Sequence, residues 1–175
     1  MSYLVRLGLP ADTALLGALE QAAAKRFATI GLTRIAEGRP TSDAEYLTIA
    51  RQERLWVAEE DGGTIVGLAI ADRVDDEGYL AEISVHPDHA GRRLASVMLD
   101  GVEAWAAAQG FGGISLTTFR DVPWNRPYYE RLGFVVLNES EAGPELRAIR
   151  HKERTRGLDK ISPRVSMRKQ VGKKV

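Results

Sequence analysis

The sequence predicts a mixed α/β fold whose sheet is mostly antiparallel, with one central parallel pair of strands and helices around it. Two observations predict this class. Three strands follow one another through tight turns between residues 55 and 85, which is typical of an antiparallel meander. A strand, a long amphipathic helix and another strand then occupy residues 79–119, and a crossover of this kind is right-handed and joins parallel strands.

Length and composition bound the protein class. The 175 residues suit one domain of ordinary size, so we expect a single domain over residues 1–175. Because cysteine is absent, disulfide scaffolds, thiolate zinc sites and iron–sulfur clusters are excluded. No apolar run approaches the ~20 residues of a membrane helix. Arg6 and Asp12 interrupt the segment where a signal peptide would be apolar, so we expect a cytoplasmic protein without a membrane partner.

Charge is distributed unevenly along the chain. Residues 147–175 contain 11 Lys or Arg and 2 Asp or Glu, whereas residues 1–146 contain 13 and 22. An acidic body favours cationic ligands such as amines, and a basic terminus favours phosphates or an acidic partner. The simpler interpretation of the basic region is a solvated helix face with a frayed end. We do not expect nucleic acid as the main partner, because the region lacks aromatic residues that would stack on bases.

The first 54 residues predict one strand and two helices. Tyr3 to Leu7 alternates weakly and predicts a strand. Pro10 begins an alanine-rich amphipathic helix that runs to about Phe27. Ser42, within Thr41-Ser42-Asp43, is a candidate N-cap of the second helix, and residues 31–40 between the helices predict a loop.

The middle of the chain predicts the meander and the long helix. Strands over residues 55–60 and 64–71 flank Asp61-Gly62-Gly63, a strong hairpin signal, and residues 75–78 make the next turn. The third strand, Tyr79 to Val85, ends at His86-Pro87 because proline cannot continue central pairing. A single helical face then follows, ended by Gly110 and formed by Leu94, Val97, Met98, Gly101, Val102 and Trp105.

The last third alternates between strands and helices. Strands are predicted over residues 114–119, 134–137 and 164–171. A short helix is predicted over residues 124–131, and a longer one over residues 144–156, capped by Gly157.

The junction between the third strand and the long helix is the most informative segment. The first amides of a helix have no internal partners and carry partial positive charge, so they attract anions. Arg92 and Arg93 add formal charge there, and small residues around Gly91 let a ligand approach the backbone. A pyrophosphate fits this pattern, although an ordinary connection with two solvated arginines remains an alternative. The usual phosphate-loop, dinucleotide and hydrolase-elbow motifs are absent.

A second segment, residues 122–134, places polar and aromatic side chains after the next strand. Asn125, Tyr128 and Tyr129 follow that strand closely. If the two strands are neighbours, these side chains lie beside the first site. The alternative is that both tyrosines are packing residues, which is the commoner role of aromatics.

Together the two segments resemble the GNAT superfamily of N-acetyltransferases. The matches are Val85-His86-Pro87, the turn from Ala90 to Ala95, and Tyr129-Glu130-Arg131-Leu132-Gly133-Phe134. The resemblance covers about residues 55–137. Ala90 stands where the family often has Gln or Arg, and Arg93 stands where it usually has its first glycine.

The resemblance implies a GNAT-like fold and direct acetyl transfer from acetyl-CoA to a primary amine. Glu82 is the candidate general base, because an amine must lose a proton before it attacks. Tyr129 is the candidate acid toward the CoA sulfur, because a phenol stays protonated at neutral pH. Separation of the strands after Val85 would free backbone groups for the cofactor. The expected cofactor contacts are Ile83, Ser84, Val85, Ala90, Gly91, Arg92, Arg93, Leu94, Ala95, Ser96, Asn125 and Tyr128.

The resemblance also assigns regions. Residues 55–137 form the cofactor-binding core, residues 11–54 the acceptor side, and residues 140–175 a basic helix and strand. The acidic body favours a cationic acceptor. Dimerisation is common in the family, so a homodimer stays open. No metal site is expected at His86 and His89, because the chain offers one other histidine and no cysteine.

Two other functions remain as alternatives. The altered turn at Ala90 and Arg93 leaves room for a catalytically inactive acyl-CoA-binding regulatory module, although Glu82 and Tyr129 favour an enzyme. The basic region from residue 147 allows an adaptor that binds an acidic partner or nucleic acid.

Overall fold

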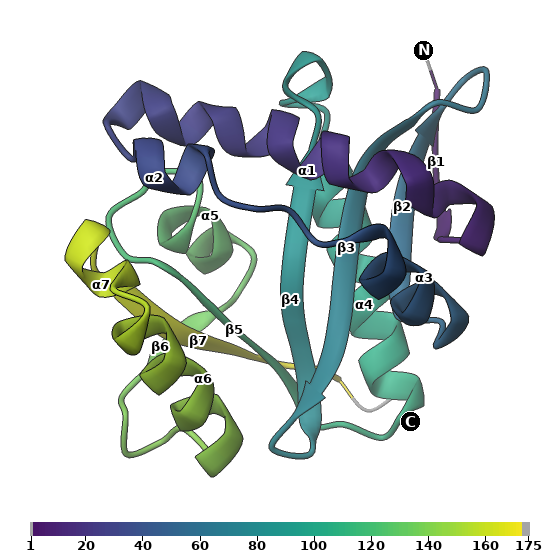
Figure 1. The fold of residues 1–175 in the computed structure, drawn as a ribbon. Coiled ribbons are helices and arrows are strands. Elements are labelled where there is room, and N and C mark those ends of the chain that lie inside the picture. Colours follow the sequence, from purple (N-terminus) through teal and green to yellow (C-terminus); the bar gives the residue numbers. More distant parts are fainter. Residues whose placement is uncertain (1, 173–175) are drawn as a thin grey trace. The chain divides into compact units, whose positions relative to one another are not determined.

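The computed structural model describes residues 2–172 (Figure 1). The chain forms two compact units. The first contains Met1–Ala71 and Glu82–Val102, and the second contains Asp72–Ala81 and Glu103–Val175. Within residues 2–172, no helix combines the length and apolar character needed to cross a membrane.

The first four strands are neighbours in the order β1, β2, β3 and β4, and the boundary between the units falls within β3, after Ala71, and within β4, after Ala81. Their bounds are β1 (Tyr3–Leu7), β2 (Leu55–Glu60), β3 (Ile65–Val74) and β4 (Glu77–Val85). Val5 of β1 lies opposite Ala58, and Val57 of β2 lies opposite Leu68. The predicted meander is therefore present, with β3 continuing beyond its predicted end and β4 beginning earlier.

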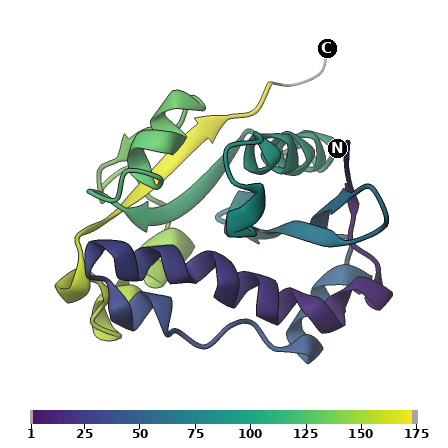
Figure 2. The ribbon, with the colours of Figure 1, turned by 90° about the horizontal axis from the view of Figure 1, so that it is seen from above.

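The helices of the first unit begin with one uninterrupted helical run (Figure 2). It consists of η1 (Pro10–Leu15), α1 (Leu16–Ala24) and η2 (Lys25–Ile30). Ser42 caps α3 (Asp43–Arg51) as predicted, because Ser42 and Glu45 exchange the two bonds of a capping box. The predicted loop over residues 31–40 was wrong in part: α2 (Thr33–Ala36) is a single turn, too short for periodicity to show.

Alternation along β2 sends its side chains into two layers of helices. Leu55 and Val57 join a core with residues of α1 and α3, namely Leu16, Leu19, Tyr46 and Ala50. Trp56 points the other way, toward α4 (Leu94–Ala108), which lies behind β2 and β3 in Figure 1. A Cβ at Gly101 would lie 2.7 Å from the Trp56 Nε1 atom, so only glycine lets α4 approach this closely.

The long helix matches its predicted extent, but its buried face differs from the prediction. Leu94, Met98 and Val102 are buried as expected. Val97 is 45% exposed, whereas Leu99 is only 2% exposed. Periodicity locates an apolar stripe, but the surface that packs against the helix decides which flank of the stripe is covered.

The second unit contains the parallel pair and two further strands. β5 (Gly113–Phe119) pairs antiparallel along its whole length with β7 (Arg164–Gln170), and β6 (Val135–Leu137) pairs with the other edge of β7. The parallel ladder between β4 and β5 consists of Gly78 opposite Ile114 and Tyr79 opposite Ser115. It therefore ends well before Val85, where strand separation was expected, because β4 continues with β3 while β5 continues with β7.

The hydrogen-bonded strand order is β1-β2-β3-β4-β5-β7-β6. This mixed sheet, antiparallel apart from the pair β4–β5 and flanked by helices, confirms the predicted fold class.

The helices of the second unit are α5 (Arg126–Arg131), α6 (Pro144–Thr155) and α7 (Leu158–Ile161). The first begins two residues later than predicted, and α7 was not predicted. Glu77 was assigned to a turn but begins β4, where its carboxylate forms an ion pair with Arg168 of β7. The last three residues of the predicted region 140–175 lie outside the described residues.

Candidate active site

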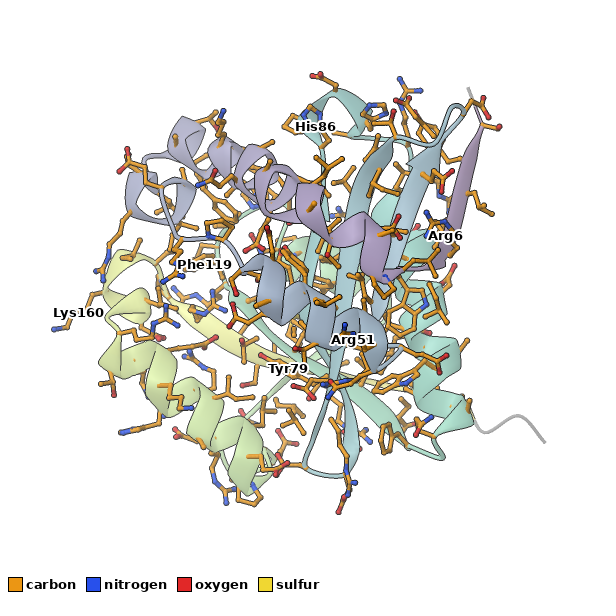
Figure 3. The ribbon with its side chains drawn as sticks, turned by 45° about the vertical axis from the view of Figure 1, so that its right-hand side comes forward. Arg6, Arg51, Tyr79, His86, Phe119 and Lys160 are labelled. Atoms are coloured by element: carbon orange, nitrogen blue, oxygen red, sulfur yellow. The ribbon has the colours of Figure 1, made fainter. Side chains whose placement is uncertain are left out.

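The carboxyl end of β4 carries the predicted base. Glu82 is partly buried and shares a strand face with Leu80 and Ser84, both of which are buried. The Ser84 Oγ donates a hydrogen bond of 2.7 Å to Glu82 Oε1. His86, where β4 ends (Figure 3), donates its backbone N–H to Val66 O at 2.8 Å. The Glu82 carboxylate is therefore hydrogen-bonded and partly buried, and it is not freely solvated.

A second carboxylate of the first unit was missed by the sequence analysis. The hydroxyl of Tyr46, which is fully buried on α3, donates to Glu20 Oε2 of α1. The Thr41 backbone N–H donates to the same oxygen at 3.1 Å. A single acid on the apolar side of an alanine-rich helix was the available signal, but its partner is 26 residues away.

Tyr46 also connects electrostatically with the predicted base. Burial raises the pKa of the Tyr46 phenol far above its usual range, and the bond to Glu20 and the charges of Glu20 and Glu82 raise it further. A hydrogen bond with Thr41 opposes this rise. Tyr46 therefore stays protonated as a donor, in a region of the first unit where two carboxylates concentrate negative charge.

The turn that opens α4 has the geometry of an anion site. Gly91 has φ +76°, and a Cβ there would meet no atom within 4 Å. The Val97 N–H makes the first bond of α4, to Arg93 O at 3.1 Å, so the amides of Leu94, Ala95 and Ser96 lack an intrahelical acceptor. Arg92 lies near the ring of Tyr3, with its guanidinium carbon 5.6 Å from the centroid.

Arg93 occupies a backbone conformation that favours glycine. Its φ is +62°, in the left-handed region where an L side chain costs about 1–2 kcal/mol. Arg93→Gly should raise the free energy of unfolding by about 0.5–1 kcal/mol, since glycine's greater freedom in the unfolded chain offsets part of the relief. Urea unfolding of the two proteins measures the difference.

Arg92→Gly is the matched control for that variant. It removes the same charge one position earlier, where φ is not positive. It should destabilise the protein, because glycine there brings no relief and the contact with Tyr3 is lost. If both variants shift stability in the same direction, strain at Arg93 is not the cause.

In the second unit, Asn125 and Tyr129 lie around α5. The Asn125 Nδ2 donates to Thr118 Oγ1 at 2.7 Å, while Asn125 Oδ1 is buried without a hydrogen-bond partner among the described residues. Tyr129 is 7% exposed, and its ring meets Tyr128 and Phe134 edge-on at centroid distances of 5.6 and 5.7 Å. The Tyr129 ring therefore packs against two aromatic neighbours.

The histidine pair has local partners. His89 Nδ1 lies 3.1 Å from the Tyr3 hydroxyl, and the His86 and His89 rings meet edge-on. Within residues 2–172, no group of three or more His, Cys, Asp or Glu side chains has the arrangement of a metal site.

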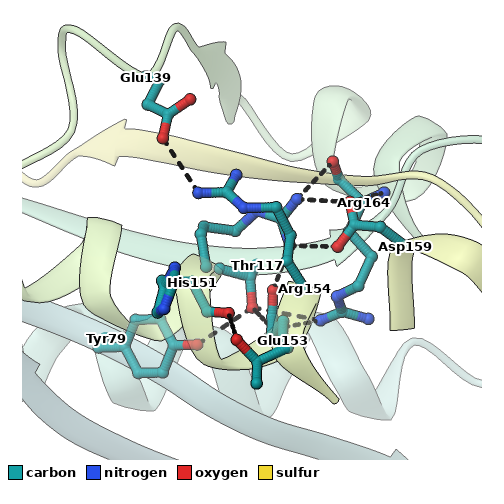
Figure 4. Close-up of polar contacts among 10 residues, drawn as sticks. Tyr79, Thr117, Glu139, His151, Glu153, Arg154, Asp159 and Arg164 are labelled. Carbon is teal, nitrogen blue, oxygen red and sulfur yellow. Dashed lines mark hydrogen bonds and ion pairs between the residues drawn. The ribbon is translucent and has the colours of Figure 1, made fainter. Parts of the chain in front are cut away.

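The basic region is only in part the solvated helix face of the simpler interpretation, because Arg147, Lys152 and Arg154 are exposed whereas other basic residues form a buried network. Arg150 is 8% exposed and forms ion pairs with Glu153 and Asp159. Arg164 pairs with Glu153 at 2.8 Å, and Thr117 Oγ1 donates to the same carboxylate at 2.6 Å (Figure 4). Sequence counts of charge missed this buried network because its acids come from the same basic segment.

Most of the chain matches a known protein family. The model of the Acetyltransferase (GNAT) family matches residues 23–134. The PaiA N-acetyltransferase of Thermoplasma acidophilum, solved with coenzyme A, has a TM-score of 0.70 at 16% identity, with 97% of this chain and 99% of that chain covered. The ribosomal-protein-S18-alanine N-acetyltransferase of Escherichia coli gives 0.66 at 16%, covering 99% of both chains.

A third similar structure is a larger protein. N-acetylglutamate synthase of Neisseria gonorrhoeae, solved with coenzyme A and N-acetyl-glutamate, gives a TM-score of 0.72 at 17% identity, covering 98% of this chain and 36% of that chain. These likenesses establish the fold, and the family model covers more than half of the sequence. The chain belongs to the GNAT acetyltransferase family.

Proposed function

We propose that this chain transfers an acetyl group from acetyl-CoA to the nitrogen of a primary amine, on a small molecule or an amino terminus. The junction of β4 and α4 carries the proposal. There a hydrogen-bonded carboxylate, Glu82, is followed by a helix N-terminus with open backbone at Gly91. Family membership and the CoA-bound state of similar structures support the choice of donor.

The turn at α4 suits the pyrophosphate of CoA. The amides of residues 94–96 point along the start of the helix with partial positive charge, and Arg92 and Arg93 add two cations. Ala90, Gly91 and Ala95 keep the approach to this backbone free of large side chains. We assign residues 90–96 to phosphate binding on these grounds.

The pantetheine arm contains amides that need partners. The unsatisfied Oδ1 of Asn125 suits an amide N–H, since a buried acceptor without a partner costs about 1–3 kcal/mol. Tyr128, half-buried beside Tyr129, would cover the arm. Backbone groups of Ile83, Ser84 and Val85 would pair with the same arm and polarise the acetyl carbonyl.

The reaction forms one bond and breaks one. Acetyl-CoA, when bound, supplies an acetyl group activated as a thioester. Glu82 takes a proton from the ammonium group of the acceptor, directly or through one water, and the neutral nitrogen forms a C–N bond. The C–S bond breaks, and the Tyr129 hydroxyl donates a proton to the leaving sulfur. The nitrogen loses its second proton to water as the amide forms, and water returns a proton to Tyr129.

The first unit supports a cationic acceptor. The charges of Glu20 and Glu82 both raise the pKa of the Tyr46 phenol, so two carboxylates lie in its surroundings. Negative charge in a partly buried region raises the local concentration of ammonium groups. By its name, one similar structure is an N-acetyltransferase of an alanine of ribosomal protein S18.

Thermal unfolding with excess acetyl-CoA tests the proposal first. At a hundredfold excess over Kd, ligand binding adds about 2.7 kcal/mol, which raises Tm by roughly 5–10 °C for a domain of this size. The expected result is a shift of this order that acetate alone does not produce, followed by thiol release with at least one member of an amine panel.

Two results would contradict the proposal. No shift at millimolar acetyl-CoA would mean that the turn with Arg93 does not hold the donor. A full shift without thiol release across a broad amine panel would instead favour the acyl-CoA-binding regulatory module.

A further inference from the structure

The second unit contains a pocket of about 180 Å³ that the acetyl-transfer proposal does not use. Arginine dominates its wall, which also includes three apolar side chains. It is lined by Leu137, Glu139, Ala142, Arg147, Arg150, Arg154, Arg164, Val165 and Ser166. Its volume is below the ~300 Å³ at which pockets for drug-sized ligands begin, so it suits a smaller molecule.

The arginines converge because of helix periodicity and strand register. Arg147, Arg150 and Arg154 lie at i, i+3 and i+7 on α6 and therefore share one face. Arg164 is the first residue of β7 and comes from another direction. Residues from two elements thus present four guanidinium groups to one small space.

The inner two arginines are fixed. Arg150 binds Asp159 through both terminal nitrogens, at 3.1 and 2.7 Å, and also pairs with Glu153. Arg164 lies over the Phe119 ring at 4.5 Å and pairs with Glu153, yet its buried Nε has no hydrogen-bond partner among the described residues. An unsatisfied donor thus remains on an otherwise ordered guanidinium.

The outer two arginines are available. Arg147 Nη1 donates to the Ala142 carbonyl oxygen and has no ion pair among residues 2–172. Arg154 pairs at 3.0 Å with Glu139, whose side chain is 68% exposed (Figure 4). An exposed pair of this kind is weak, so a ligand can displace Glu139.

The charge balance identifies the class of ligand. Four guanidinium groups of the pocket face three carboxylates, those of Glu139, Glu153 and Asp159. One positive charge is therefore left over. We propose that this pocket binds a short-chain carboxylic acid, with its carboxylate on Arg147 and Arg154 and its carbon chain against Leu137, Ala142 and Val165.

A carboxylate fits better than a phosphate for two reasons. The surplus of one charge neutralises a carboxylate, whereas a phosphate near pH 7 brings up to two negative charges. The three apolar lining residues would also desolvate a phosphate without bonding it, whereas contact between them and an aliphatic chain is favourable.

Titration of the isotope-labelled full chain with sodium butyrate, followed by amide NMR shifts, tests the proposal. Ionic strength is held constant with chloride, and butyramide and inorganic phosphate are titrated in parallel. The expected result is saturable shifts among residues 137–166 with butyrate, and weaker binding of both comparison molecules.

Variants at exposed positions should change the affinity for butyrate in opposite directions. Arg147→Gln combined with Arg154→Gln should weaken butyrate binding about tenfold, because charge-assisted bonds are lost. Glu139→Gln should strengthen binding severalfold, because Arg154 loses its competing carboxylate. Lys152→Gln removes a charge from an exposed position of the same helix outside the pocket, and should leave the affinity unchanged.

Several results would overturn the proposal: no saturable shift, equal binding of butyramide, tighter binding of phosphate, or equal weakening by Lys152→Gln and the double variant. None of these measurements uses acetyl transfer. Failure of the carboxylate-site proposal can therefore be distinguished from failure of the proposed acetyl transfer.

Discussion

Glu82→Gln should lower kcat/KM for the amine about 10²–10³-fold near pH 7, because general-base catalysis contributes about 10²–10⁴-fold. The loss should shrink as pH rises toward the ~10.4 of a free alkylamine, since the acceptor is then already neutral and needs no base. A pH–rate profile of both proteins measures this convergence.

Three comparisons separate catalysis from folding. The acetyl-CoA-dependent rise in Tm should persist in Glu82→Gln, because the phosphate-binding turn is untouched. Glu37→Gln, at an exposed glutamate of the same unit, should leave the profile unchanged. Tyr129→Phe keeps the packed ring and removes the hydroxyl donor. The loss of kcat/KM in this variant should therefore not depend on ionisation of the amine. Superimposed profiles for wild type and Glu82→Gln would remove Glu82 from the mechanism.

Glu153→Gln should destabilise the protein by about 3–5 kcal/mol, because it leaves two largely buried arginines short of their shared counter-charge. The side chains of Glu153, Arg150 and Arg164 are 13%, 10% and 12% exposed. The expected fall in Tm is roughly 6–20 °C, at 2–4 °C per kcal/mol for a chain of this length. Glu139→Gln, which breaks an exposed pair, should cost less than about 1 kcal/mol and serves as the control.

The pH dependence of this effect has a definite sign. Burial alone would raise the pKa of Glu153, but hydrogen bonds from Arg164, Thr117 and Arg150 and the charge of Arg164 outweigh burial and lower it below 4.5. A lowered folded-state pKa contributes stability that is fully present above the unfolded value and is lost as pH falls through the folded one. The difference in the free energy of unfolding between wild type and Glu153→Gln should therefore be constant near neutrality and should become smaller below about pH 4.5. A gap that widens in acid would contradict the assignment.

Local signals predicted most of the fold. The hairpin turn at Asp61-Gly62-Gly63, the cap at Ser42 and the apolar period from Leu94 each act within a few residues, so they survive without tertiary context. The errors have the same origin. A single turn such as α2 is shorter than the window in which a period can be recognised, and Glu77 joins β4 alongside an ion pair with a residue at the far end of the chain.

The candidate site likewise has a part that local sequence motifs predict and a part that depends on tertiary contacts. By itself, the sequence determined the fold class and the family, and motifs of adjacent residues made Glu82, Gly91 and Tyr129 the candidates for the site. Only the tertiary structure decided which side chains share a partner. The bond from Tyr46 to Glu20 spans 26 residues, and the bond from Thr117 to Glu153 spans 36.

The arginines of α6 show the physical reason most clearly. Their charge is fixed by the sequence, but its effect depends on burial and on the distance to carboxylates, which only folding sets. Arg150 is locked in ion pairs, whereas Arg147 of the same helix faces a pocket without one among the described residues. The sequence therefore determined which residues are charged. Packing in the folded chain determined which of those arginines form buried ion pairs and which face a pocket.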